Sequence, residues 1–145
     1  MQELQTHTSP TQSAIQVVEA FFAAGCAKDI ERASALISDD IVYQNVPFPP
    51  DRGRLAVERR LRQIYRMPGA LDIRTHHIAE RDGVVLTERT DGLRAKWLDV
   101  EFWVCGTFEV RDGKITLWRD YFDLGTVALK FLVGPVRALL RVSTA

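Results

Sequence analysis

The sequence predicts an α+β fold, with helices packed on one face of a bent, mainly antiparallel sheet. Apolar residues recur at helical spacing through most of the first half of the chain and alternate with polar residues through the second half. Two Asp-Gly dipeptides, at 82–83 and 112–113, separate strand-like segments, as is typical of turns between antiparallel strands. A pocket is expected on the concave side of such a sheet.

The first helix is expected after a polar tail over residues 1–12. From Ser13 onward, apolar side chains follow one helical face as far as Cys26. Asp29 is placed to cap a second, short helix over residues 30–37. Each of these helices has one apolar face with which to cover the sheet.

A strand and a third helix complete the first half of the chain. Residues 41–50, IVYQNVPFPP, predict a strand that runs into a proline-stiffened loop. Residues 54–67 predict a helix in which five arginines are solvated, while the apolar residues, Leu55 among them, face the core.

Four strands follow in the second half, and a helix comes after them. The strand segments are 71–80, 84–93, 100–110 and 114–124. Within them Trp103, Phe108 and Trp118 are expected in the core, and Asp123 is expected to cap or turn the chain. An apolar helix is expected over residues 126–142, where charged residues, Gly and Pro indicate that it does not span a membrane.

Composition narrows the class of protein. The chain has 145 residues, 46% of them hydrophobic, which fits one globular domain. Nineteen basic and nineteen acidic residues balance, so a nucleic-acid partner is not expected. There is no signal-peptide pattern and no run of ~18 uncharged apolar residues, so a cytoplasmic protein without a transmembrane segment is expected.

Cys26 and Cys105 are expected to be buried structural thiols, and His76 and His77 lack spaced partner ligands for a metal.

Five polar residues are candidates for a site inside the pocket. Side chains alternate across a strand, so Arg89 and Asp91 project from the same face. Asp120 lies on an otherwise apolar strand face and therefore points inward, where an aspartate needs a partner. Tyr43 and Asn45 are again two residues apart, which places a hydroxyl and an amide on one side of their strand.

Three separated segments, VYQNVPFPP, VLTERTDGLR and GKITLWRDYFDL, resemble the limonene-1,2-epoxide hydrolase family, a branch of the NTF2-like (SnoaL-like) fold. The resemblance extends over residues 13–124, and the block FWVCGTFEV looks most similar to actinobacterial members. It implies a cone-shaped, strongly curved mixed sheet, mainly antiparallel, with the N-terminal helices covering a deep pocket. On this basis the chain divides into a tail (1–12), the epoxide hydrolase domain (13–124) and a C-terminal helix or tail (125–145) packed on the same domain.

The resemblance also implies a homodimer that hydrolyses an epoxide to a vicinal diol without a metal or cofactor. Asp91 resembles the general acid, Asp120 the base and Arg89 the bridge between them, while Tyr43 and Asn45 resemble the residues that hold the attacking water. Strand alternation and the same resemblance indicate the substrate-binding wall. Its expected members are Phe22, Leu93, Phe102, Val104 and Phe122.

The charges of the candidate site are consistent with this chemistry. Two ionised aspartates beside one buried arginine would leave an uncompensated negative charge, which is costly in a dry pocket. With one retained proton the trio is neutral and contains an acid and a base at once. Epoxide opening needs such a pair, because the oxygen must gain a proton while water attacks carbon from the far side.

Two other functions are open alternatives from the sequence. A ketosteroid isomerase or polyketide cyclase of the same fold also uses an inward aspartate and a pocket tyrosine, but it does not need the bridging arginine. A non-enzymatic binder would use the polar residues only to orient a small ligand. The apolar wall favours an apolar epoxide without distinguishing a terpene epoxide from a fatty or sterol-derived one.

Overall fold

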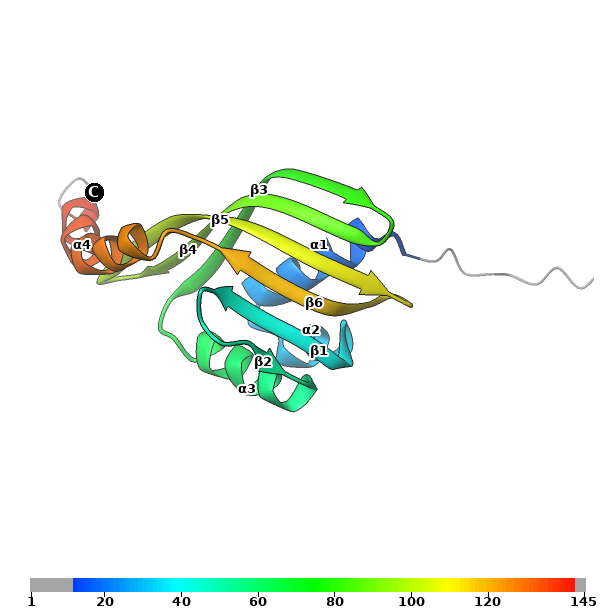
Figure 1. Ribbon diagram of the computed structural model, residues 1–145. Helices are drawn as coiled ribbons and strands as arrows, with labels where there is room; N and C mark the ends of the chain where they lie inside the picture. The colour runs from blue at the N-terminus through cyan, green and yellow to red at the C-terminus, as the bar shows by residue number, and fades with distance from the viewer. Residues whose placement is uncertain (1–11, 143–145) are drawn as a thin grey trace, which may run out of the picture.

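The computed structural model describes residues 12–142 as one curved sheet with four helices (Figure 1). The strands are β1 (Ile37–Val46), β2 (Asp51–Arg52), β3 (Ala70–Arg81), β4 (Val84–Ala95), β5 (Leu98–Arg111) and β6 (Lys114–Tyr121). The helices are α1 (Ala14–Cys26), α2 (Ile30–Ala35), α3 (Arg54–Tyr65) and α4 (Leu124–Val142). The strand order is β2-β1-β6-β5-β4-β3, and all neighbours are antiparallel except β1 and β6, which are parallel. The predicted α+β fold with a mixed, mainly antiparallel sheet is confirmed, and the sheet is open rather than closed.

Capping side chains mark the start of three helices. At α1 the Ser13 hydroxyl accepts a hydrogen bond from the Gln16 backbone at 3.2 Å, while the Gln16 side chain accepts one from the Ser13 backbone at 2.9 Å. Asp29 accepts from the backbone N–H three residues further on at 3.0 Å, as predicted for α2. Asp123 accepts from the Thr126 backbone at 3.0 Å, which confirms its predicted capping role at α4. Each cap satisfies a backbone donor that the helix itself leaves without a partner.

The second helix is shorter than the expected range of 30–37. It ends at Ala35, and Ile37 begins β1 instead, where it is buried and pairs with Ile115 of β6. A β-branched side chain fits a buried, pleated surface better than it fits the end of a six-residue helix.

Both Asp-Gly dipeptides form the predicted tight turns, between β3 and β4 and between β5 and β6. The φ angles are +53° and +79° at Asp82 and Gly83, and +50° and +72° at Asp112 and Gly113. Positive φ at both central residues is the requirement of a type I′ turn, whose twist matches that of the flanking strands.

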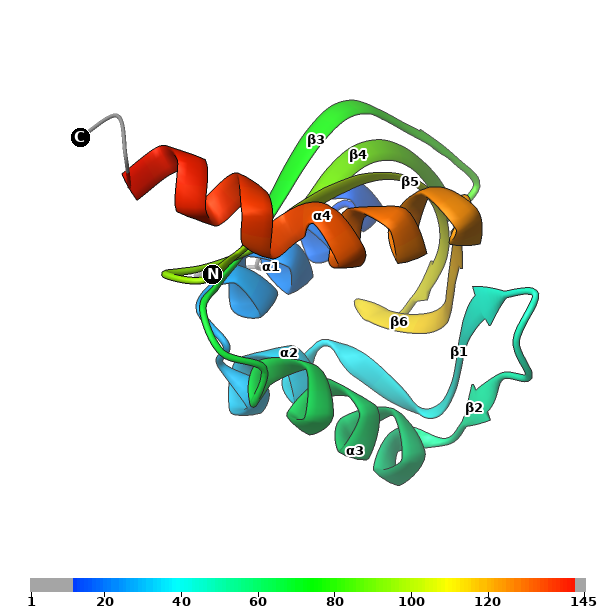
Figure 2. The ribbon, with the colours of Figure 1, turned by 90° about the vertical axis from the view of Figure 1, so that its left-hand side faces the viewer.

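The core lies between the concave face of the sheet and the N-terminal helices. Figure 2 shows β3, β4 and β5 arching over α1, with α4 crossing the end of the sheet. The ring centroids of Phe21 on α1 and Trp118 on β6 lie 5.1 Å apart in an edge-to-face arrangement, and Trp118 stacks on Phe108 of β5. The predicted core positions of Phe108 and Trp118 are therefore confirmed. A smaller apolar cluster around Val100 lies where α4 packs on β5.

Trp103 is not in the core, contrary to the prediction. Its side chain is 53% exposed, because it alternates with Phe102 and Val104 and therefore points from the outer face of the sheet. There its indole N–H donates to the Glu88 carboxylate at 3.0 Å. The alternation that turns Phe102 and Val104 toward the concave face of the sheet therefore turns Trp103 away from it.

Two further burial predictions are wrong. Leu55 is exposed in the first turn of α3, since it lies two residues from the buried Val57 and therefore on the other side of the helix. Cys26, the last residue of α1, is exposed at the end of its helix, whereas Cys105 is half-buried.

Two domain boundaries were expected from the sequence, one after residue 12 and one after residue 124. Nearly all of the expected tail, residues 1–12, lies outside the described residues, and the boundary between 124 and 125 stays a prediction. Within residues 12–142, no helix combines the length and the apolarity needed to cross a membrane.

Candidate active site

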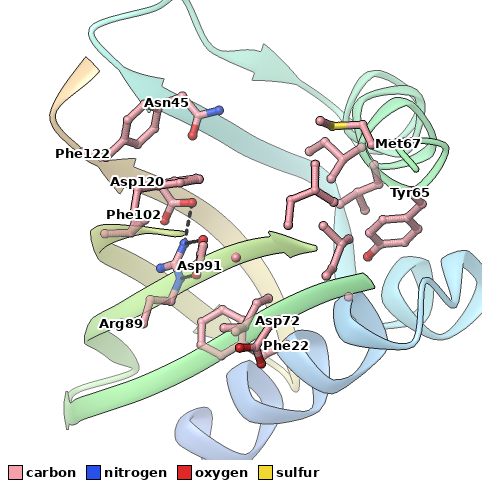
Figure 3. Close-up of a pocket in the computed structure, with 18 of the residues that line it drawn as sticks. Phe22, Asn45, Tyr65, Met67, Asp72, Arg89, Asp91, Phe102, Asp120 and Phe122 are labelled. Atoms are coloured by element: carbon pink, nitrogen blue, oxygen red, sulfur yellow. Dashed lines mark hydrogen bonds and ion pairs between the residues drawn. The ribbon is translucent and has the colours of Figure 1, made fainter. Parts of the chain in front are cut away.

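A cavity of about 240 Å³ lies between the concave face of the sheet and the helices, with a mainly apolar lining. All ten residues expected in the pocket line it. They are Phe22, Tyr43, Asn45, Arg89, Asp91, Leu93, Phe102, Val104, Asp120 and Phe122. The polar members gather on one wall, as Figure 3 shows for the arginine and the two aspartates.

Arg89 lies between the two aspartates (Figure 3). Its Nε and Nη2 atoms donate to the two carboxylate oxygens of Asp91 at 2.9 and 3.2 Å. Nη2 also donates to Oδ2 of Asp120 at 2.7 Å. The Arg89 side chain is 1% exposed, compared with 6% for Asp120 and 24% for Asp91. The trio is therefore withdrawn from water, and Asp91 is its most accessible member.

Strand register and one glycine make room for this trio. Gly106 on β5 pairs with Asp120 on β6 on one side and with Thr87 on β4 on the other. A Cβ at Gly106 would collide with Nη1 of Arg89 and lie 2.8 Å from Thr87 Oγ1 and 2.9 Å from Asp120 Oδ1. Glycine is therefore required for the guanidinium to reach across β5.

The remaining surroundings of the guanidinium hold it in place. Thr87 accepts a hydrogen bond from Nη1 of Arg89 at 3.2 Å. The ring of Phe22, on α1, has its centroid 5.1 Å from the guanidinium carbon, a cation–π distance. Because hydrogen bonds and the ring fix the arginine, both carboxylates are held at set positions in the pocket.

Burial changes the proton affinity of all three groups. It raises the pKa of Asp120, with the charge of Asp91 adding to the effect and Arg89 opposing it. Burial also raises the pKa of Asp91 against the opposing effect of Arg89, and the nearby Asp72 carboxylate raises it further. For Arg89, burial alone would lower the pKa, but the two aspartates raise it, so the guanidinium stays charged. One fixed cation and two carboxyls with raised pKa favour the state with one proton.

Tyr43 and Asn45 form a second polar group beside Asp120. Nδ2 of Asn45 donates to the Tyr43 hydroxyl at 2.7 Å, and Asn45 pairs with Asp120 across β1 and β6. Burial and the charge of Asp120 raise the pKa of Tyr43, so its hydroxyl keeps its proton. Among the described residues, Oδ1 of Asp120 and the indole N–H of Trp118 make no well-formed hydrogen bond. The indole nevertheless lies close enough to Asp120 to oppose the rise in its pKa. The Asp120 carboxylate, the Tyr43 hydroxyl and the Asn45 amide therefore lie together on the pocket wall.

Sequence reasoning missed several residues of the site. Thr87 and Gly106 surround the guanidinium, and a glycine inside a strand was the signal for a close approach. Tyr65, Asp72 and Phe131 line the pocket from α3, β3 and α4. No local pattern indicated these three, because they reach the cavity only through the packing of distant elements.

Comparison with known proteins decides the family. The model of the limonene-1,2-epoxide hydrolase catalytic domain matches residues 12–133. The chain belongs to this family. It is 47% identical over 119 residues to epoxide hydrolase EphG of Mycobacterium tuberculosis, a match that covers 82% of this chain and 79% of that protein. The family predicted from the three sequence segments is confirmed, and epoxide hydrolysis is the activity that membership carries.

Solved structures confirm the fold. The structure of a limonene-epoxide-hydrolase-like enzyme of M. tuberculosis superimposes with a TM-score of 0.79 at 42% identity, over 88% of this chain and 96% of that one. A SnoaL-like polyketide cyclase from Shewanella denitrificans gives a TM-score of 0.75 at 14% identity, over 82% and 96% of the two chains. At that identity the likeness concerns the fold alone. The predicted NTF2-like, SnoaL-like fold is therefore confirmed.

Proposed function

We propose that this epoxide hydrolase converts an apolar epoxide to a vicinal diol in one step, by direct attack of water and without a covalent intermediate or a cofactor. The single observation that supports this proposal is the buried trio in which Arg89 is shared between Asp91 and Asp120. In the state with one proton, the trio contains a general acid and a general base on the same wall of the pocket.

Asp91 is the group to which we assign the proton. It is the more accessible of the two carboxyls and therefore the better placed to meet the epoxide oxygen. The neighbouring Asp72 carboxylate disfavours its ionisation and raises its pKa, in addition to burial. As the ring opens, Asp91 transfers its proton to the leaving oxygen, and no free alkoxide forms.

Asp120, Tyr43 and Asn45 hold the attacking water in this proposal. Because Asn45 donates its amide hydrogen to the Tyr43 oxygen, the Tyr43 O–H and the Asn45 carbonyl oxygen are available to other partners. A water that donates to Oδ1 of Asp120 and to Asn45, and accepts from Tyr43, keeps one lone pair for the epoxide carbon. Asp120 takes a proton from this water as Asp91 gives one up, so the trio ends each turnover with the charge it had at the start.

The remainder of the pocket favours an apolar substrate. Phe22, Leu93, Phe102, Val104 and Phe122 all line the cavity, and the rings of Phe102 and Phe122 lie 5.9 Å apart. Such a wall excludes bulk water, which strengthens the interactions of the trio with the reacting atoms. We assign these five residues to substrate binding.

The homodimer and the cytoplasmic location expected from the sequence stay predictions. Leu86, Trp103 and Tyr121 are exposed on the outer face of the sheet, on adjacent strands, and would suit contact with a second copy. Light scattering on the purified protein measures the particle mass, and a monomeric mass would contradict the homodimer.

A single-turnover reaction in water enriched in heavy oxygen tests the mechanism. With enzyme in excess over an apolar epoxide, direct attack by water places the label in the diol at the first turnover. Label in an aspartate of the enzyme, with unlabelled diol released first, would indicate a covalent ester instead. Absence of turnover across a panel of apolar epoxides, with tight binding of the same compounds, would favour the binding-protein alternative.

A further inference from the structure

The C-terminal helix α4 exposes a row of large apolar side chains that neither the core nor the pocket uses. Their spacing along the chain keeps them on one helical face. We call this row the α4 stripe. It consists of Leu129, Leu132, Val136, Leu139 and Leu140, all exposed.

The opposite face of α4 is fixed against β5. Ala138 is buried, and a Cβ at Gly134 would lie 2.8 Å from Cγ2 of Val100 and 3.2 Å from the backbone oxygen of Asp99, which shows how closely the helix approaches β5. Nη2 of Arg141 lies 2.7 Å from Oδ2 of the buried Asp99 on β5. Since this face is held on the sheet, the α4 stripe must point away from the body of the protein.

The charges of α4 all have the same sign. Residues 124–142 contain Lys130, Arg137 and Arg141 and no aspartate or glutamate. Arg141 is paired with Asp99, whereas Lys130 and Arg137 are half-exposed and lie beside the stripe on the helical projection. A helix with one apolar face and a basic flank is the pattern of helices that lie in the plane of an anionic membrane surface.

The same helix borders the pocket. Phe131, next in sequence to Leu132 of the stripe, lines the cavity, and Figure 2 shows α4 crossing the end of the curved sheet. The surface formed by the stripe and the wall of the substrate cavity are therefore parts of one element.

We propose that α4 docks this enzyme on an anionic lipid surface, with the α4 stripe among the acyl chains and Lys130 and Arg137 at the phosphates. An apolar epoxide dissolved in the bilayer then reaches the cavity beside Phe131 without crossing bulk water. This delivery step rests on the proposed function, whereas the docking itself does not depend on turnover.

Charge favours lipid over a second copy of the same helix as the occupant. An antiparallel two-fold contact between α4 helices would bring their basic flanks to the same side, and the helix has no carboxylate to compensate them. Anionic phosphates supply the missing charge and acyl chains cover the leucines.

Vesicle sedimentation tests the docking. We expect wild-type protein to sediment with vesicles of mixed phosphatidylcholine and phosphatidylglycerol roughly tenfold more strongly than with phosphatidylcholine alone, and to detach as salt is added. Leu132→Glu should reduce binding to the mixed vesicles by roughly tenfold or more, because it places a carboxylate within the stripe. Leu55→Glu is the matched control, since both leucines are 76% exposed on helices and Leu55 is not on α4.

Several outcomes would overturn the proposal. Wild type that stays in the supernatant with mixed vesicles would do so, as would equal losses in the Leu132 and Leu55 variants. A dimer that Leu132→Glu splits, together with no vesicle binding by wild type, would assign the stripe to a second copy. Delivery is tested separately: Leu132→Glu should keep its rate on a water-soluble epoxide and lose rate on an epoxide dissolved in the mixed vesicles.

Discussion

Two clusters of aspartate and arginine are each built around one buried charged side chain, Arg89 in the pocket and Asp99 on β5. In the pocket, Arg89 forms ion pairs with both Asp91 and Asp120. Near the other end of β5, Asp99 is 2% exposed and is contacted by two arginines, Arg94 at 3.4 Å and Arg141 at 2.7 Å, which are 43% and 51% exposed.

The ratio of arginine to aspartate differs between the pocket cluster, to which we assign the catalytic groups, and the Asp99 cluster, which supports α4. One arginine cannot neutralise two carboxylates, and burial raises the pKa of both, so the pocket cluster favours a state with one proton that can be transferred. Asp99 is contacted by two arginines, and one of them, Arg94, is also paired with the Glu101 carboxylate. The second cluster joins α4 to β5 through the contact between Arg141 and Asp99.

The largest expected effect comes from removing a carboxylate of the pocket cluster. Asp91→Asn or Asp120→Asn should lower kcat by ~10²- to 10⁴-fold or more, because each removes one of the two positioned proton transfers. Asp99→Asn, the matched control from the other cluster, should retain a kcat near that of wild type. Steady-state kinetics on one water-soluble epoxide measure all three, with circular dichroism to show that each variant is folded. Equal losses in the three variants would contradict the distinction between the clusters.

Gly106→Ala should have the next largest effect. Its methyl group would collide with Arg89 and press on Thr87 and Asp120, which displaces the trio and lowers kcat by up to ~10²-fold. Gly92→Ala is the control, because a Cβ there would meet its nearest neighbour, Cγ of Glu101, at an ordinary 3.5 Å. If both alanine variants kept wild-type kcat, the space at Gly106 would not be what positions the arginine.

The dependence of rate on pH reports the shared proton. The pKa of Asp91 and the pKa of Asp120 are both raised, mainly by burial, so the proton is retained above the ordinary aspartate range near pH ~4. As the pH rises through the higher pKa of the pair, the acid is lost and kcat falls; at low pH the second carboxyl is protonated and the base is lost. We expect a bell-shaped kcat profile, and a rate independent of pH would contradict a proton held by the trio.

The same shifts predict how stability depends on pH. A carboxyl whose pKa is raised in the folded state favours folding most strongly while it is protonated. Its contribution is therefore complete below the unfolded pKa of ~4 and is lost as the pH rises through the folded value. Urea denaturation over this range should show this loss in wild type and a smaller one in Asp120→Asn.

The smallest expected effect on activity comes from the supporting cluster, where the change should appear in stability instead. Asp99→Asn removes the charge that Arg141 and Arg94 contact, at an estimated cost of about 1–3 kcal/mol in the free energy of unfolding. Limited proteolysis should then cut α4 faster than in wild type. A stability equal to that of wild type would mean that the apolar contacts of Gly134 and Ala138 alone hold the helix.

Much of the fold and of the site could be predicted from local patterns. The two Asp-Gly turns, the caps at Asp29 and Asp123 and the strand alternation that brings Arg89 and Asp91 to one face are all properties of neighbouring residues. Such patterns depend on backbone geometry that a few consecutive residues determine by themselves. Trp103 was expected in the core although strand alternation places it on the opposite face from Phe102 and Val104, and that prediction was wrong.

The sequence by itself determined the kind of fold, the family and the inward set of polar residues. Tertiary structure alone decided that Gly106 opens a path for Arg89 across β5, that Asp72 lies near Asp91, and that Phe131 reaches the pocket from α4. It also decided which face of α4 is covered. These are contacts between elements far apart in the chain, and they depend on strand register and helix packing, which no local pattern of residues encodes.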